Sequence, residues 1–286
     1  MNHATSRLWA WRELQTSPPR YKYKDEKGLK KVAVFVSSMT YPQYKNKHLE
    51  EAFFNPDDFA GYKKWDRKSF PRKMVIIYQR YPLAYFKRKY AGKYKTLAFT
   101  AGHNILKYGS VGLIKMAGIG SPHATLKFEE LVARGAREFI CIGTAGGLKH
   151  EGLFLCDRAI RDEGTSHHYY PHEKYSYPSK DLTESLANAI GKQGLEYERA
   201  TTWTIDAPYR ETKVEIAQYK KEGVATVDME ASALFAVAKY RKVKIASAFV
   251  VSDLLGKKWE PKFHHASVKR KLNKLVDISI NCLENK

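Results

Sequence analysis

Apolar and polar residues alternate with changing periods along this chain, and from residue 73 the changes predict a regular series of elements. Short apolar, β-branched runs predict strands over 74–79, 111–120, 139–148, 153–160, 197–205 and 243–253. Helical spacing predicts helices over 121–135, 181–194, 210–223, 229–241 and 268–284. Because strands and helices alternate, the series predicts an α/β three-layer sandwich with a central mixed, largely parallel sheet.

The ends of one predicted helix carry clear signals. Ser121 suits the N-cap, Pro122 suits the first helical position, and Gly135 suits the stop. Residues 1–72 are less regular and rich in Tyr, Lys and Pro, with one strand candidate over 32–38. We expect an N-terminal extension, residues 1–72, that packs on a main domain formed by residues 73–286.

The composition narrows the class of protein. The chain has 286 residues, 43% of them hydrophobic, which is typical of a globular protein. No apolar run approaches the roughly 20 residues of a membrane span, and the first residues lack a signal-peptide pattern. Three cysteines without CxxC spacing favour a reduced, cytoplasmic protein over a disulfide scaffold or zinc site.

A formal net charge of +20 suggests an anionic substrate or nucleic acid. Two short basic clusters occur at 87–89 and 269–271, but no nucleic-acid-binding motif accompanies them. Lysines scattered over solvated helix faces account for the same charge. Nucleic acid is therefore not expected as the main ligand.

A glycine-rich segment, 143–147, directly follows a predicted strand. Ligands of open α/β sheets bind beyond the carboxyl ends of the strands, which is where this segment falls. Its glycines allow close backbone approach, and Thr144 offers a hydroxyl. A plain turn would have the same pattern.

Acidic residues occupy two comparable places. Asp253 follows the apolar run 245–251, where partial burial would raise the pKa of a general acid or base; capping of the next turn is the alternative. In "VDMEASALF", Asp228 and Glu230 flank Met229 at a predicted helix start. Charges so near a core are costly unless they are paired.

The helix macrodipole would stabilise Glu230 there without any ligand. A functional alternative is that Glu230 accepts two hydrogen bonds from a vicinal diol, worth roughly 1.5–3 kcal/mol each. Met229 would then offer an apolar surface to a sugar ring. Asp228 either supports this group or bonds to backbone.

Three motifs in this order, "FICIGTAGGL", "AIRDEGTSHHY" and "VDMEASALFAVA…VVSD", resemble the nucleoside phosphorylase / uridine phosphorylase superfamily over about residues 73–284. The resemblance implies a single α/β domain that assembles as dimers, trimers or hexamers. It also implies cleavage of the N-glycosidic bond of a nucleoside by phosphate or water, with no metal or other cofactor.

The resemblance assigns roles to the residues that match. Glu230 would hold the ribose hydroxyls against Met229, with Asp228 nearby. Thr144, Ala145 and Gly146 would contact the ribose and the nucleophile. Asp253 would protonate the departing base, which favours purines. Anionic groups beside the sugar suit a transition state that resembles an oxocarbenium ion.

The arginines that hold phosphate in such proteins are missing from their usual places. Ala84 and Cys141 stand at two of these places, and the third falls near Tyr94. A phosphate dianion binds poorly without bidentate arginine partners. Either other groups have taken over, or water is the nucleophile. The turn "GTAGGL" is similar to that of methylthioadenosine/adenosylhomocysteine nucleosidases, although their glutamate-rich turn is missing here.

The candidates for a rebuilt phosphate site are Arg80 and Arg161, with Thr144. For base recognition, Pro208 replaces an aromatic residue, so we expect Tyr209, Arg210 and His168 to contact the base. Adjacent histidines near Arg161 rarely chelate one ion, so no metal site is expected.

The sequence thus predicts a cytoplasmic, homo-oligomeric nucleoside phosphorylase that prefers purines and uses inorganic phosphate as co-substrate. A hydrolytic nucleosidase is the first alternative. A non-catalytic nucleoside-binding protein, whose positive charge serves an anionic partner, is the second.

Overall fold

The computed structural model describes residues 21–25, 28–32, 41–44, 46–100, 102–256 and 258–285. The chain divides into two compact units, residues 1–45 and residues 46–286. In the first unit, β1 (Tyr21–Asp25) pairs antiparallel with β2 (Gly28–Val32). The strand predicted over 32–38 falls, beyond Val32, outside the described residues.

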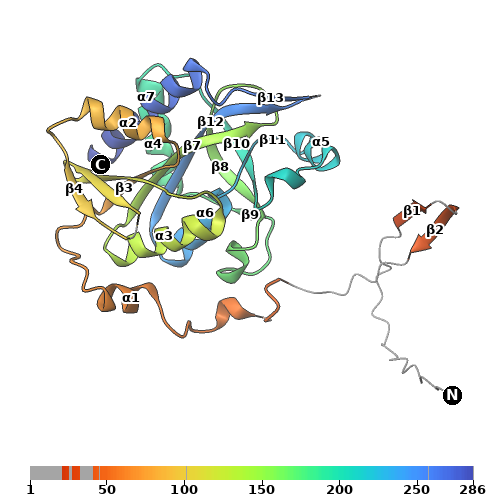
Figure 1. The fold of residues 1–286 in the computed structure, drawn as a ribbon, viewed down its shortest axis with the longest axis horizontal. Helices are drawn as coiled ribbons and strands as arrows, with labels where there is room; N and C mark the ends of the chain where they lie inside the picture. Colours follow the sequence, from red (N-terminus) through yellow and green to blue (C-terminus); the bar gives the residue numbers. More distant parts are fainter. Residues whose placement is uncertain are drawn as a thin grey trace. The chain divides into compact units, whose positions relative to one another are not determined.

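The second unit is built on an 11-stranded mixed sheet (Figure 1). Its strands are β3 (Lys73–Ile77), β4 (Lys95–Ala98), β5 (Asn104–Tyr108), β6 (Val111–Lys115), β7 (Glu138–Gly147), β8 (Leu153–Asp162), β9 (Tyr175–Ser176), β10 (Glu198–Ile205), β11 (Val224–Asp228), β12 (Lys244–Leu255) and β13 (Trp259–Pro261). Their order is β13-β12-β8-β10-β11-β7-β3-β6-β5-β4, with β9 beside β8. Since β12 pairs with both β7 and β8, the strands β7, β11, β10, β8 and β12 close into a ring.

Helices cover both faces of this sheet (Figure 1). They are α1 (Pro56–Tyr62), α2 (Arg80–Lys89), α3 (Ser121–Ala133), α4 (Lys180–Lys192), α5 (Lys213–Lys221), α6 (Ala231–Tyr240) and α7 (Ala266–Glu284). One apolar core joins α2, α4 and α7 to the sheet, and a second joins α3 and α6 to it. The predicted three-layer α/β architecture around a mixed sheet is confirmed.

Several helix starts differ from the prediction, among them that of α5, which begins at Lys213 rather than at residue 210. Gly120, not Ser121, is the N-cap of α3, and its φ of 95° lies where a residue with a side chain would be strained. The helix predicted from residue 229 starts at Ala231, because Asp228 still belongs to the buried strand β11. Only Met229 and Glu230 separate the strand from the helix, which is too short a connection to show as a boundary in the pattern.

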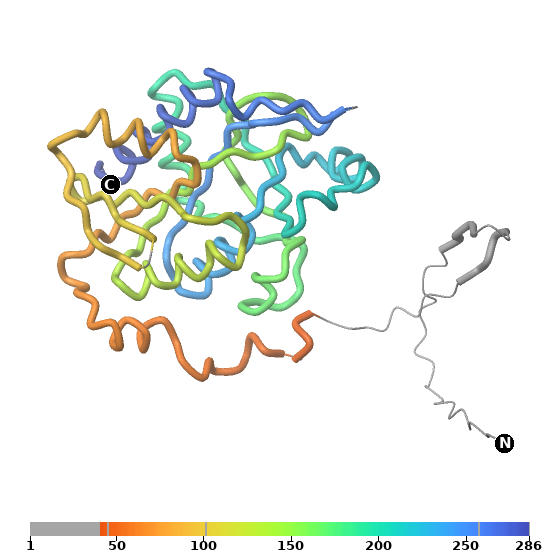
Figure 2. Tube along the Cα trace, viewed as in Figure 1, coloured from red at the N-terminus to blue at the C-terminus, as the bar shows by residue number. Residues whose placement is uncertain are grey.

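Residues 46–72 belong to the same compact unit as the sheet. Their helix α1 packs against α3, and Figure 2 shows this part of the chain, in orange, passing beside it. The ring of Trp65 stacks on that of Phe99 at a centroid distance of 5.6 Å. The compact unit therefore begins at Asn46, upstream of the boundary predicted after residue 72. The packing predicted for residues 1–72 as a whole stays a prediction.

None of the helices within the described ranges is long and apolar enough to pass through a bilayer. The three cysteines, Cys141, Cys156 and Cys282, are free and buried.

Candidate functional site

A cavity of about 290 Å³ opens where β3, β7, β11 and β12 meet. Seven of the predicted site residues line it together: Thr144, Ala145, Gly146, Asp228, Met229, Glu230 and Asp253. They come from segments far apart in sequence, and the parallel pairing of β12 with β7 brings two of these segments side by side. The sheet thus gathers the first and third motifs around one space, whereas the second motif, residues 159–169, contributes no residue to the lining.

The side chain of Asp228 stabilises the turn between β11 and α6 by hydrogen bonds. Its Oδ2 accepts hydrogen bonds from the amides of Glu230 (2.9 Å) and Ala231 (2.7 Å). Its Oδ1 accepts from the hydroxyls of Thr204 (2.8 Å) and Thr202 (3.2 Å). Burial raises the pKa of this carboxyl, which four donors nonetheless satisfy. Of the two roles left open for Asp228, the structure shows bonding to backbone and to neighbouring hydroxyls.

Glu230 is the residue that this turn presents to the cavity. It occupies the N-cap position of α6 without capping it, since Asp228 accepts from the first helical amide. One of its oxygens, Oε1, accepts a 2.6 Å hydrogen bond from the amide of Gly120. Burial, and then the charge of Asp228, raise the pKa of Glu230 to about 8. Among the described residues no side chain donates a hydrogen bond to this carboxyl group, which lines the cavity and is available to a ligand.

Asp253 lines the same cavity and belongs to β12. The pairing with β7 shifts register between Val251 and Asp253, so Ser252 is an extra residue in a β-bulge. The Ser252 hydroxyl donates to Oδ1 and the indole N–H of Trp259 donates to Oδ2, both at 2.9 Å. Asp253 is not at the strand end, because β12 continues to Leu255 and pairs there with β13. The turn-capping alternative is therefore wrong.

Gln79 is a cavity residue that the sequence analysis missed. It directly follows the end of β3, and its Nε2 donates a 2.9 Å hydrogen bond to Oγ1 of Thr144. The other amide atom, Oε1, is buried and has no hydrogen-bond partner within the described residues. Its place at the end of a buried strand was the signal that could have found it.

Glu211 was missed as well. It lines the cavity with Asp253, just after the short 3-10 helix Pro208–Arg210. Burial, followed by the negative charges of Asp253 and Glu215, raises the pKa of Glu211 to about 7. The cavity thus carries four carboxyl groups, and burial raises the pKa of two of them, Glu211 and Glu230, toward neutrality.

Residues 87–284 match the model of the family described as the phosphorylase superfamily. The chain belongs to this superfamily. The predicted family and the prediction of an enzyme of the nucleoside phosphorylase type are thereby confirmed.

Several members of the phosphorylase superfamily resemble the chain in sequence. It is 27% identical to the purine nucleoside phosphorylase of Plasmodium vivax over 180 residues, which are 57% of this chain and 69% of that protein. It is 24% identical to the uridine phosphorylase of Haemophilus influenzae over 185 residues, which are 58% of this chain and 73% of that protein.

Solved structures agree in fold. The AMP nucleosidase of Bacteroides thetaiotaomicron superposes with a TM-score of 0.67 at 22% identity, covering 82% of this chain and 100% of that one. The uridine phosphorylase of Vibrio fischeri superposes with a TM-score of 0.66 at 21% identity, covering 77% of this chain and 94% of that one. At these identities the likeness shows the fold alone.

The arginines proposed to rebuild a phosphate site do not line the cavity of this superfamily member. Arg80 is exposed at the start of α2. Arg161 is buried, and its guanidinium donates to Oγ of Ser166 at 2.9 Å and to the carbonyl of Pro171 at 2.8 Å. These bonds use Arg161 to order the loop after β8. Neither arginine lies in a position to bind phosphate in this cavity.

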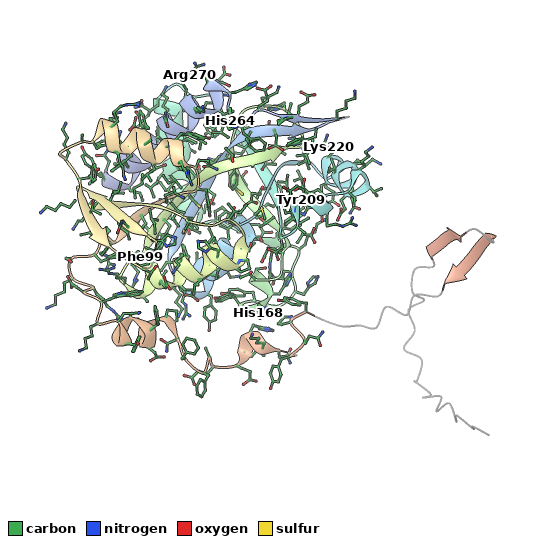
Figure 3. The ribbon with its side chains drawn as sticks, viewed as in Figure 1. Phe99, His168, Tyr209, Lys220, His264 and Arg270 are labelled. Atoms are coloured by element: carbon green, nitrogen blue, oxygen red, sulfur yellow. The ribbon has the colours of Figure 1, made fainter. Side chains whose placement is uncertain are left out.

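The residues predicted to contact the base lie elsewhere too. The short helix Pro208–Arg210 turns Tyr209 fully outward, beside α5 in Figure 3, and Arg210 is also exposed. His168 lies near the segment that carries Lys47, whose ammonium is 2.9 Å from Nδ1. Of the short helix Pro208–Arg210, only Pro208 lines the cavity. Glu211, the residue after this helix, lines it as well.

Among the described residues, the side chains that line the cavity include acidic groups and no basic ones. Within the described residues it contains no lysine, arginine or histidine, against the carboxyl groups of Glu211, Asp228, Glu230 and Asp253. Cys141, where the resemblance led us to expect a phosphate-binding arginine, has a thiol whose burial raises its pKa to about 12. Such a lining suits a reacting group that becomes positive.

Proposed function

We propose that this protein cleaves the N-glycosidic bond of a purine nucleoside with inorganic phosphate, releasing the free base and a pentose 1-phosphate. The observation that carries the proposal is that Glu230 and Asp253, far apart in sequence, line one and the same cavity. Family membership supports it, because relatives of this chain are named as nucleoside phosphorylases.

The pentose would lie against Met229 with its hydroxyls donating to Glu230. As the glycosidic bond lengthens, positive charge develops on the sugar, and the carboxylates around it stabilise that charge without having to reorient. Thr144, held by Gln79, would contact the ribose and the incoming nucleophile. Asp253 would lie beside the base. A carboxyl group at that position favours a purine as substrate, because a ring nitrogen of the purine gains a proton as the base departs.

Hydrolysis is a second candidate, which a specific observation favours. A cavity lining without cations is a poor site for a phosphate dianion. The unpartnered Oε1 of Gln79 is an acceptor, so it would bind a neutral water molecule better than an anion. The structural likeness to an AMP nucleosidase is compatible with this alternative.

A panel of purine and pyrimidine nucleosides, incubated with and without phosphate, separates these functions. Base release that requires phosphate is expected. Equal release without phosphate would assign hydrolysis, and binding without any release would contradict both enzymatic functions.

Glu230→Gln tests the sugar site in the same assay. Measured above about pH 8, where Glu230 is ionised, loss of the charged acceptor is expected to lower kcat/KM about 10- to 100-fold, which corresponds to a charged hydrogen bond of about 1.5–3 kcal/mol. Glu196→Gln, at an exposed position outside the cavity lining, is the matched control and should match wild type.

A further inference from the structure

We infer that Glu211, rather than Asp253, delivers the proton to the departing base. The inference rests on the proposed function and changes the role expected for Asp253. It follows from how the two carboxyl groups at the base end of the cavity are bonded.

Asp253 is bonded as a carboxylate. Both of its oxygens accept hydrogen bonds, one from Ser252 and one from Trp259. Donors to the charged form favour ionisation. The indole N–H of Trp259 can only donate, so a proton on Oδ2 would face another proton. A proton on Oδ1 would be bonded to the Ser252 hydroxyl rather than directed into the cavity.

Glu211 has the complementary properties. Its carboxyl group lines the same cavity, is half-buried, and makes no hydrogen bond to a side chain or backbone group of the described residues. Because burial raises its pKa to about 7, roughly half of the molecules carry the proton near neutral pH.

Two negatively charged groups near Glu211 also raise its pKa. Asp253 on β12 and Glu215 on α5 are both negative and favour its protonated form. Glu215 itself accepts from the amide (2.9 Å) and hydroxyl (2.6 Å) of Thr212, so it is occupied at the start of α5. Lys220, further along α5, donates to the carbonyl of Leu255 at 2.7 Å. Glu211 is thus the carboxyl group at this end that holds a transferable proton.

The step balances with either nucleophile. The O–H bond of Glu211 breaks as an N–H bond forms on the five-membered ring of the purine. The glycosidic bond breaks and leaves its electron pair on the base, while an oxygen of the nucleophile bonds to the anomeric carbon. Hydrogen phosphate or water loses one proton in forming that bond, and this proton restores Glu211 through solvent.

The test compares a purine nucleoside with its N7-methylated form, whose base already carries a positive charge and needs no proton. We expect Glu211→Gln to lower kcat/KM for the unmethylated nucleoside by about 100-fold, within the usual range for a general acid. For the methylated nucleoside it should stay within about threefold of wild type. Glu196→Gln serves again as the control for loss of one carboxylate.

The pH profile gives a second readout. Wild-type kcat/KM should fall above about pH 7, as Glu211 loses its proton, and Glu211→Gln should lack this limb. Asp253→Asn should keep the limb and move it to lower pH, since it removes a charge that raises the pKa of Glu211.

Equal losses on both nucleosides, or a limb that disappears in Asp253→Asn and persists in Glu211→Gln, would overturn the assignment. If the wild type releases base from neither nucleoside, the proposed function itself is wrong. The two failures are therefore distinguishable.

Discussion

At the scale of single residues, two carboxylates in one turn do different work. Asp228 has four hydrogen-bond donors and holds the backbone, whereas Glu230 has one, the amide of Gly120, and faces the cavity. A carboxyl group that is buried with so few partners lowers the stability of the empty protein. This is the expected signature of a residue kept for a ligand.

Glu230→Gln is therefore expected to stabilise the protein as it removes activity. The pKa of Glu230 is raised in the folded state, so its ionisation favours the unfolded chain as pH rises from about 4.5 to about 8. The glutamine keeps an acceptor for Gly120 and never ionises. Its free energy of unfolding should exceed that of wild type by about 1–3 kcal/mol more at pH 9 than at pH 5. Urea denaturation at both pH values measures this; a difference independent of pH would contradict it.

Sequence motifs identified Thr144, Glu230 and Asp253 as cavity residues, but they did not identify Gln79 or Glu211. The first three lie in recognisable motifs at the ends of apolar runs. Glu211 sits in an irregular segment, and its importance depends on the position of Asp253, which lies over 40 residues away in sequence. Arg161 illustrates the opposite error, because its loop uses the whole guanidinium.

At the scale of elements, the strand β7 forms the floor of the site because it pairs with three neighbours. Gly146 lies opposite Val227 on β11 and Asp253 on β12. A Cβ on Gly146 would approach a methyl of Leu255 to 2.7 Å and one of Val227 to 2.9 Å. Close passage of three strands explains the glycine at this position.

Gly146→Ala is expected to lower the free energy of unfolding by about 1–3 kcal/mol, the usual cost of overpacking. KM for the nucleoside should rise, because Leu255 and Val227 both line the cavity and must shift. Gly191→Ala is the control: it lies in α4 with open space around it, so it should stabilise by about 0.5–1 kcal/mol. Thermal unfolding and steady-state kinetics of both variants check this. Unchanged stability and KM in Gly146→Ala would contradict the packing argument.

Patterns identified long elements better than short ones. The helices α3, α4 and α7 and the strands β7 and β12 were predicted from periodicity. The strand β11 has five residues, all buried, and only Met229 and Glu230 separate it from the helix after it, so the pattern did not show a boundary between the two. The β4–β5 pair lies at the sheet edge, where β4 is largely exposed and its pattern is weak.

At the scale of the whole molecule, the net charge of +20 and the acidic cavity are separate features. The basic residues lie outside the cavity lining, so the total charge says little about the site. Oligomeric assembly and cytoplasmic location stay predictions.

Residues 46–72 are expected to be necessary for a stable domain. A variant that begins at Lys73 should have a free energy of unfolding about 3–5 kcal/mol below that of a variant that begins at Asn46. It lacks Phe70, whose buried ring belongs to the core beneath α3, as well as the Trp65 ring that stacks on Phe99. Calorimetry of the two variants measures the difference. Equal stabilities would place the domain boundary after residue 72, as the sequence pattern suggested.

The hydrogen bond from the amide of Gly120 to Glu230 also affects how well the site can discriminate between sugars. Because Oε1 already accepts from backbone, fewer acceptor sites of the carboxylate remain for the hydroxyls of a pentose. A sugar that lacks one of these hydroxyls forfeits a hydrogen bond to Glu230, so the site should accept deoxyribose less well than ribose.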